Sequence, residues 1–212
     1  FGCEDGALVW ADGGFTKIAS PDADGRLGTL VGSDASDVIL ADYTATERTL
    51  AEGTSLVALI DTRAATMRLV ELPTTYTFRS LARDADGSGV VLGTDGALHV
   101  IEPATGRLTG AVPVVDPWHA PEAWQDPRPT ALTFDGSVYV TDPARRSVHA
   151  VDVQTARVWR SGTLEQVPNE IVGVTGEAAE VSPTHEDGHG DHGDHDEHDA
   201  HDAHDAHDHG DH

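Results

Sequence analysis

Short runs of alternating apolar and polar residues recur along the chain and predict β-strands. Four of them share one pattern, at residues 6–10, 56–61, 98–102 and 148–152. Equivalent positions in these runs are 49, 41 and 50 residues apart, at Val9, Ala58, His99 and His149. Repeats of about 40 to 50 residues that hold several short strands are typical of propeller blades. Amphipathic helical periodicity is absent from the body of the chain, so we predict an all-β antiparallel fold, a β-propeller.

The last two complete repeats divide into four predicted strands each. In the third repeat the predicted strands are 78–83, 89–94, 97–102 and 107–112. In the fourth they are 131–134, 137–141, 148–153 and 157–161. Asp86 with Gly87 and Asp95 with Gly96 predict tight turns, and at the second of these we expect positive φ at both residues.

The same register predicts an incomplete ring. Residues 1–3 match the second strand of a blade, and residues 171–174 begin a further first strand. The chain would thus supply about four blades of a ring of about seven, as the C-terminal part of a longer propeller. A four-bladed ring made by this chain alone is the alternative. We expect blades over residues 1–176, a linker over 177–184 and a disordered tail over 185–212.

Charge and composition exclude some classes of function. Among 212 residues, 37 are acidic and 13 are Lys or Arg, for a net charge of −24, which argues against nucleic-acid binding. No apolar run is long enough to span a membrane, no signal peptide is visible in this chain, and we expect a monomer. The single cysteine, Cys3, is either a small buried hydrophobe or half of a disulfide with upstream sequence, which would imply an oxidising compartment.

Histidine is concentrated in the tail, which has no aliphatic residue larger than alanine and cannot form a core. Ten of the thirteen histidines lie there, among eleven acids. Seven of them follow an unbroken spacing of three. The ten are His185, His189, His192, His195, His198, His201, His204, His207, His209 and His212.

This composition predicts metal binding. Imidazole nitrogen suits zinc, copper and nickel, and an aspartate can complete a site or accept the second ring N–H. Two or three imidazoles and a carboxylate can surround one ion in many overlapping ways, so we expect several exchangeable ions rather than one tight site. Zinc is the expected metal, with copper or nickel possible. A solvated acidic tail without metal is the alternative, but it leaves the histidines unexplained.

A second candidate site is the long connection between the third and fourth repeats, residues 115–129. His119, Glu122 and Asp126 are its possible metal ligands, with Trp118 and Trp124 as packing anchors. A long loop between blades lies near the mouth of the central channel, where ligands commonly bind. The alternative is a proline-stiffened surface loop with a solvent-facing histidine.

Other repeated polar residues predict structural roles. His99 and His149 occupy equivalent positions, which is typical of a structural hydrogen bond, for example one between blades. Asp61, Glu102 and Asp152 precede turns, where capping is expected. No Gly-x-Ser-x-Gly, phosphate-loop, dinucleotide or His-Glu-x-x-His motif is present, so we expect no enzyme activity.

Three short motifs carry a family resemblance: Phe-Gly-Cys-Glu-Asp-Gly-Ala-Leu-Val at 1–9, Thr-Asp-Gly-Ala-Leu-His at 94–99, and Pro-Arg-Pro at 127–129 followed by Val-Tyr-Val-Thr-Asp-Pro at 138–143. Across residues 1–176 the chain resembles AztD-type zinc metallochaperones. The resemblance implies an extracytoplasmic propeller that passes zinc to the solute-binding protein of a zinc ABC transporter. It also implies a zinc site on the propeller, for which His119 is the best body ligand, and a flexible His-rich segment. Here that segment is C-terminal, and the N-terminal blades are absent.

The sequence therefore predicts a non-enzymatic zinc chaperone of the periplasm or cell envelope. Two alternatives remain: a propeller enzyme of the lactonase or quinoprotein type, and a cell-surface protein-binding scaffold whose tail buffers metal. Deleting residues 185–212 would separate them, since an enzyme would keep its activity while a chaperone would lose most of its zinc capture.

Overall fold

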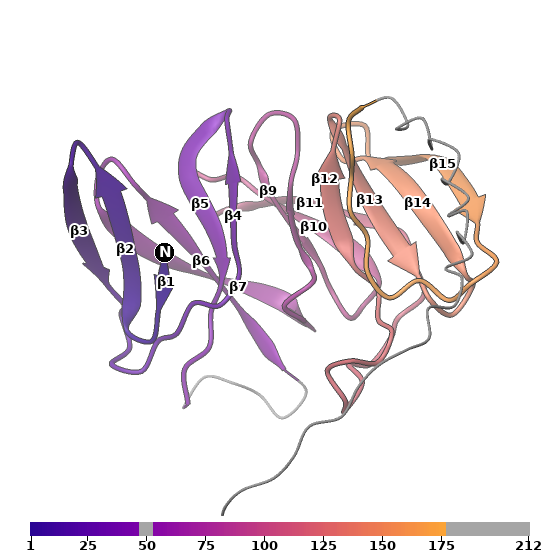
Figure 1. Cartoon of the computed structure of the whole chain (residues 1–212), viewed down its shortest axis with the longest axis horizontal. Coiled ribbons are helices and arrows are strands. Elements are labelled where there is room, and N and C mark those ends of the chain that lie inside the picture. The colour runs from indigo at the N-terminus through magenta and orange to yellow at the C-terminus, as the bar shows by residue number, and fades with distance from the viewer. Residues whose placement is uncertain (47–52, 177–212) are drawn as a thin grey trace, which may run out of the picture. The chain divides into compact units, whose positions relative to one another are not determined.

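The described part of the protein consists of β-strands and their connections (Figure 1). The structure, a computed structural model, describes residues 1–46 and 53–176. No described helix is long and apolar enough to cross a membrane. The strands are β1 (Gly2–Cys3), β2 (Gly6–Ala11), β3 (Gly14–Ala19), β4 (Leu30–Ser33), β5 (Ser36–Asp42), β6 (Thr54–Asp61), β7 (Thr66–Tyr76), β8 (Leu81–Arg83), β9 (Gly89–Leu92), β10 (Ala97–Ile101), β11 (Leu108–Pro113), β12 (Ala131–Phe134), β13 (Ser137–Asp142), β14 (Ser147–Asp152) and β15 (Arg157–Thr163).

These strands form four antiparallel sheets, each made of consecutive strands. The first sheet has three strands, β1 to β3, and the other three sheets have four strands each: β4 to β7, β8 to β11 and β12 to β15. In the first sheet β1 pairs with β2 at the position predicted for a second strand. The predicted all-β propeller architecture, with about four blades, is confirmed.

The hydrophobic core lies between adjacent sheets. Leu40 and Val57 of the second sheet pack with Val91 and Ile101 of the third. The third sheet also buries its opposite face against the fourth, which brings Val90 and Leu98 to Val138, Val140 and Val151. Because both faces of the third sheet are covered, β9 and β10 are buried at every position. This explains why their sequences are apolar almost throughout.

A buried arginine joins the second and third sheets. The Arg83 side chain is 2% exposed and donates hydrogen bonds to the carbonyl oxygens of Val31 at 3.1 Å and Val38 at 2.7 Å. It also donates to Ser88 O at 3.2 Å and to Gly87 O. Burial lowers the pKa of Arg83. The backbone carbonyl oxygens thus take the place of the water molecules that the guanidinium loses on burial, as a buried cation requires.

Two predicted first strands differ from the structure. The strand predicted over 78–83 begins only at Leu81, because Thr77 and Ser80 form a turn in which Ser80 N donates to Thr77 O at 3.0 Å. Residues 171–174 form no strand, although they are placed beside β12: a Cβ on Gly173 would lie 2.1 Å from the Phe134 ring. A strand needs a hydrogen-bonded neighbour, and no described strand pairs with this segment.

The tight turns also correct one expectation. Of Asp95 and Gly96, only Gly96 has positive φ, at 83°. Its φ and its closeness to Val115 O, which would lie 2.1 Å from an added Cβ, both require glycine. Both central residues have positive φ instead in the two-residue hairpin turns at 12–13 and 135–136, each an Asp-Gly pair.

Candidate functional site

The loop between β11 and β12 is the longest connection between strands in the described part of the chain. Hydrogen bonds fix its first half to the third sheet. Val114 N and Val115 N donate to Gly96 O at 3.0 and 3.1 Å. Trp118 then donates through its backbone N to Thr94 O at 2.8 Å and through Nε1 to Gly93 O at 3.0 Å. With both donors used, the indole of Trp118 anchors the loop, as the sequence predicted.

A buried arginine fixes the second half of the loop. Arg128, 4% exposed, donates through Nη2 to Ala123 O at 2.9 Å and through Nε to Asp126 O at 3.4 Å. Its guanidinium carbon lies 5.3 Å from the centre of the Phe78 ring, a cation–π contact. Burial first, and then the charge of Arg79, lowers the pKa of Arg128. Arg128 was not among the site residues predicted from the sequence, because its setting within Pro-Arg-Pro gives no sign that it is buried.

An ion-pair chain supports the loop from the fourth sheet. Arg145, in the turn between β13 and β14, pairs with Asp116 of the loop and with the buried Asp142 at 3.4 Å. The carboxylate of Asp116 raises the pKa of Arg145. The loop is therefore attached to the sheets on both sides of it, and its backbone position is well determined by polar contacts.

His119 lies exposed where three hollows meet. One of about 710 Å³ also includes Glu71 and Asp95. A second of about 400 Å³ includes Glu122, and a third of about 200 Å³ includes Arg128 and Asp142. Asp126 lines none of these three. The structure thus places His119 with Glu122, but does not bring Asp126 to the same hollow.

No pre-formed metal cage is found in this part of the chain. Within residues 1–46 and 53–176, no group of three or more His, Cys, Asp or Glu could hold a metal ion. Asp95 is already engaged, accepting hydrogen bonds from Ala97 N at 3.2 Å and lying 2.9 Å from His99 Nε2. His119 can therefore offer one imidazole beside one carboxylate, which is too few for a closed zinc site.

The predicted packing role of Trp124 is wrong. Its side chain is 64% exposed, although the loop around it is fixed. The hydrogen bonds on both sides go to backbone carbonyls: Arg128 binds Ala123 O at 2.9 Å, and Asn169 Nδ2 binds Gln125 O at 3.2 Å. The loop therefore needs no packing from this ring, which faces solvent.

The tail ligands lie outside the described residues. This holds for the predicted linker 177–184 and for every predicted metal ligand of the tail: His185, His189, His192, His195, His198, His201, His204, His207, His209 and His212. Their role remains a prediction from the sequence.

His99 and His149 have structural partners inside their own sheets rather than between blades. His99 Nε2 meets Asp95 Oδ2, and the histidine is 5% exposed. His149 Nδ1 lies 2.8 Å from Ser161 Oγ, and its Nε2 lies 3.2 Å from Ser147 Oγ. Both histidines occupy the middle of a third strand, and these hydrogen-bond partners belong to their own sheets.

Of the three acids that precede turns, Asp61 and Asp152 cap the turn backbone as predicted, whereas Glu102 accepts from a side-chain hydroxyl instead. Asp61 Oδ1 accepts from Arg63 N at 3.0 Å and Ala64 N at 2.8 Å, and Asp152 Oδ1 accepts from Gln154 N at 3.0 Å and Thr155 N at 3.1 Å. Glu102 Oε2 accepts from the Thr105 hydroxyl at 2.6 Å. These bonds lower the pKa of Asp152 and of Glu102.

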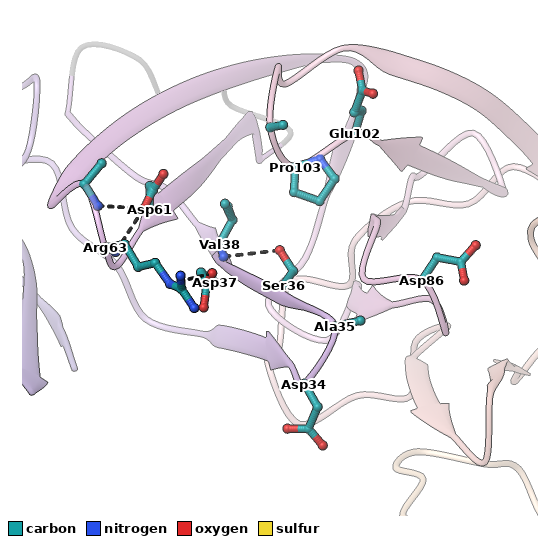
Figure 2. Close-up of a pocket in the computed structure, with 12 residues that line it drawn as sticks. Asp34, Ala35, Ser36, Asp37, Val38, Asp61, Arg63, Asp86, Glu102 and Pro103 are labelled. Carbon is teal, nitrogen blue, oxygen red and sulfur yellow. Dashed lines mark hydrogen bonds and ion pairs between the residues drawn. The ribbon is translucent and has the colours of Figure 1, made fainter.

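A fourth hollow is acidic and lies at the turns opposite the β11–β12 loop. It has a volume of about 670 Å³ and is lined by Asp34, Asp37, Asp61, Asp86 and Glu102 with one arginine, Arg63. In Figure 2 the carboxylates of Asp34, Asp86 and Glu102 lie apart from one another, and Arg63 reaches Asp37 at 2.7 Å. With Asp61 already capping its turn, this hollow provides negative charge but no coordination sphere.

Comparison with known proteins finds a relative that is named a zinc chaperone. No protein-family model matches the chain. The chain is 28% identical over 165 residues to the zinc chaperone AztD of Citrobacter koseri, a match that covers 77% of this chain and 37% of that protein. The predicted resemblance to AztD-type chaperones is confirmed.

Crystal structures support the same relationship. A crystal structure of Citrobacter koseri AztD matches with a TM-score of 0.64, and a structure of apo AztD matches with 0.65, both at 26% identity. Each match covers 84% of this chain and 48% of the AztD chain. The chain therefore spans less than half the length of these relatives.

Proposed function

We propose that this chain belongs to a zinc chaperone: it captures zinc outside the cytoplasm and hands it to the solute-binding protein of a zinc ABC transporter. The observation that carries the proposal is the match to AztD, a protein described as a zinc chaperone, along 165 residues of this chain. The His/Asp tail supports it independently, since its ten imidazoles are the ligand type that zinc prefers. Nothing in this activity requires a bond to be made in a substrate, so we propose no enzymatic role.

Capture would begin at the tail. Imidazoles spaced by three residues, with carboxylates between them, offer many two- and three-ligand arrangements, so several ions can bind and exchange. Handover would proceed by ligand exchange: an incoming ligand of the acceptor replaces one imidazole at a time, so that the ion stays coordinated throughout. His119, exposed beside Glu122, would serve as a single additional ligand on the body rather than as a closed site.

Zinc release by acid tests the proposed ligands. Only the neutral imidazole binds metal, and nearby carboxylates raise the pKa of the imidazoles above its ordinary value of about 6.5, so protons should displace zinc as the pH falls from about 7 to 5. We expect several zinc ions per full chain at about pH 7 and few at about pH 5. Equilibrium dialysis at the two pH values measures this, and equal zinc content at both would contradict imidazole ligation.

A further inference from the structure

The β11–β12 loop leaves one large aromatic side chain, Trp124, exposed to solvent although the loop is held firmly by hydrogen bonds. Residues 116–117, 119–120 and 122–127 are exposed, and this stretch includes Trp124 at 64% exposure. Long connections without strands of their own are uncommon in compact domains unless they have a function. The attachment of the loop to the sheets therefore does not explain why these residues are exposed.

The loop is also stiff. Four prolines, Pro117, Pro121, Pro127 and Pro129, restrict its backbone, and hydrogen bonds hold the carbonyls on either side of Trp124. A large aromatic side chain on a pre-ordered backbone loses little conformational entropy when a partner covers it. Tryptophans in such settings are the residues that most often dominate protein–protein affinity.

The charge around Trp124 defines the chemistry of the partner. Glu122 and Asp126 lie two residues to either side of it, and neither forms an ion pair within residues 1–46 and 53–176. The nearest cation in sequence, Arg128, is buried beneath the loop. A partner surface that fits must offer an apolar pocket for the indole, bordered by lysine or arginine.

We propose that Trp124, with Glu122 and Asp126, is the docking surface for the protein that accepts zinc, and that this acceptor presents an apolar pocket with a basic rim. This inference rests on the proposed function. It adds the place of contact: His119, five residues from Trp124 on the same loop, would lie at the edge of the complex, where a transferred ion could meet it.

Binding of the zinc-loaded full chain to the zinc-free solute-binding protein of a zinc ABC transporter, measured by calorimetry, tests the surface. Trp124→Ala should raise the dissociation constant at least about tenfold, as expected for a tryptophan at the centre of an interface. Trp10→Ala is the matched control, since Trp10 is 55% exposed on β2, and should change affinity by less than about twofold. A Trp124→Ala effect no larger than that of Trp10→Ala, or no binding by the wild-type chain, would overturn the proposal.

Charge reversal provides a second variant that does not depend on the tryptophan. Glu122→Lys with Asp126→Lys should slow association by about tenfold at low salt and reduce its salt dependence, whereas Asp34→Lys at the opposite turns should not. If Asp34→Lys slowed association as much as Glu122→Lys with Asp126→Lys, the proposed docking surface would be contradicted. Zinc content and zinc transfer of the same samples separate the two hypotheses: if the wild-type chain transfers zinc but the loop variants bind normally, only the docking surface is wrong.

Discussion

Replacing the ten tail histidines by glutamine should remove most of the zinc that the full chain binds at neutral pH. Glutamine keeps the length, the polarity and the neutral charge of the position, but its amide is a poor zinc ligand compared with imidazole. The eleven carboxylates stay in place in this variant, so it separates imidazole ligation from simple attraction of cations by an acidic segment. We expect at least an about tenfold drop in bound zinc at a fixed micromolar free zinc concentration, because the remaining oxygen ligands bind zinc weakly.

Histidines of the body supply the controls for this experiment. His149→Gln removes an imidazole that is hydrogen-bonded inside its own sheet and should leave zinc content unchanged. His119→Gln should remove no more than one equivalent, because no third ligand stands beside His119 and Glu122 in the described part of the chain. If the tail variant kept its zinc while His119→Gln lost it, the main zinc site would be on the propeller.

Replacing Arg83 by methionine should cause a large loss of stability at the interface between the second and third sheets. Its guanidinium donates to four carbonyl oxygens from a position that is 2% exposed, and methionine would leave these acceptors without their donor. An unsatisfied buried acceptor costs about 1 to 3 kcal/mol, and some of these carbonyls keep other partners, so we expect the free energy of unfolding to fall by about 3 kcal/mol. Urea unfolding followed by tryptophan fluorescence measures this change.

Arg68 offers a matched control for that measurement. It also donates to carbonyl oxygens of the neighbouring sheet, those of Ala104 at 3.3 Å and Thr105, but its side chain is exposed. Water can replace these bonds, so Arg68→Met should cost less than about 1 kcal/mol. If the two variants lose the same free energy of unfolding, the burial of Arg83 does not determine how much its hydrogen bonds contribute to stability.

The strand pattern could be predicted because each blade repeats the same alternation. The third strands at 98–102 and 148–152 became β10 and β14 almost without change, and β1 took the predicted place beside β2. The strand predicted to start at Phe78 starts at Leu81, because an apolar residue in a turn resembles one in a strand when only the pattern is read. Residues 171–174 have a strand-like composition but no hydrogen-bonded neighbouring strand. Strand pairing depends on the tertiary structure, so it cannot be predicted from composition.

The candidate site was only partly predictable. Loop length and the family resemblance pointed to His119, but whether Glu122 and Asp126 converge on it depends on backbone directions that the four prolines set. The contrast between Trp118 and Trp124 shows the same limit. Trp118 lies where Gly93 O and Thr94 O can accept its two N–H groups, whereas Trp124 donates no such hydrogen bond within residues 1–46 and 53–176. Arg128 was missed because an arginine between prolines gives no sign that it is buried.

Zinc handover in the presence of a competing chelator tests the central claim most directly. The zinc-loaded full chain is mixed with the zinc-free solute-binding protein and an excess of a strong, non-permeating chelator, and the zinc on the acceptor is then measured after separation. If the ion passes by ligand exchange within a complex, the acceptor gains zinc although the chelator is in excess. If the chelator collects all of the zinc, the ion was released into solution first, and the chain is a zinc buffer rather than a chaperone.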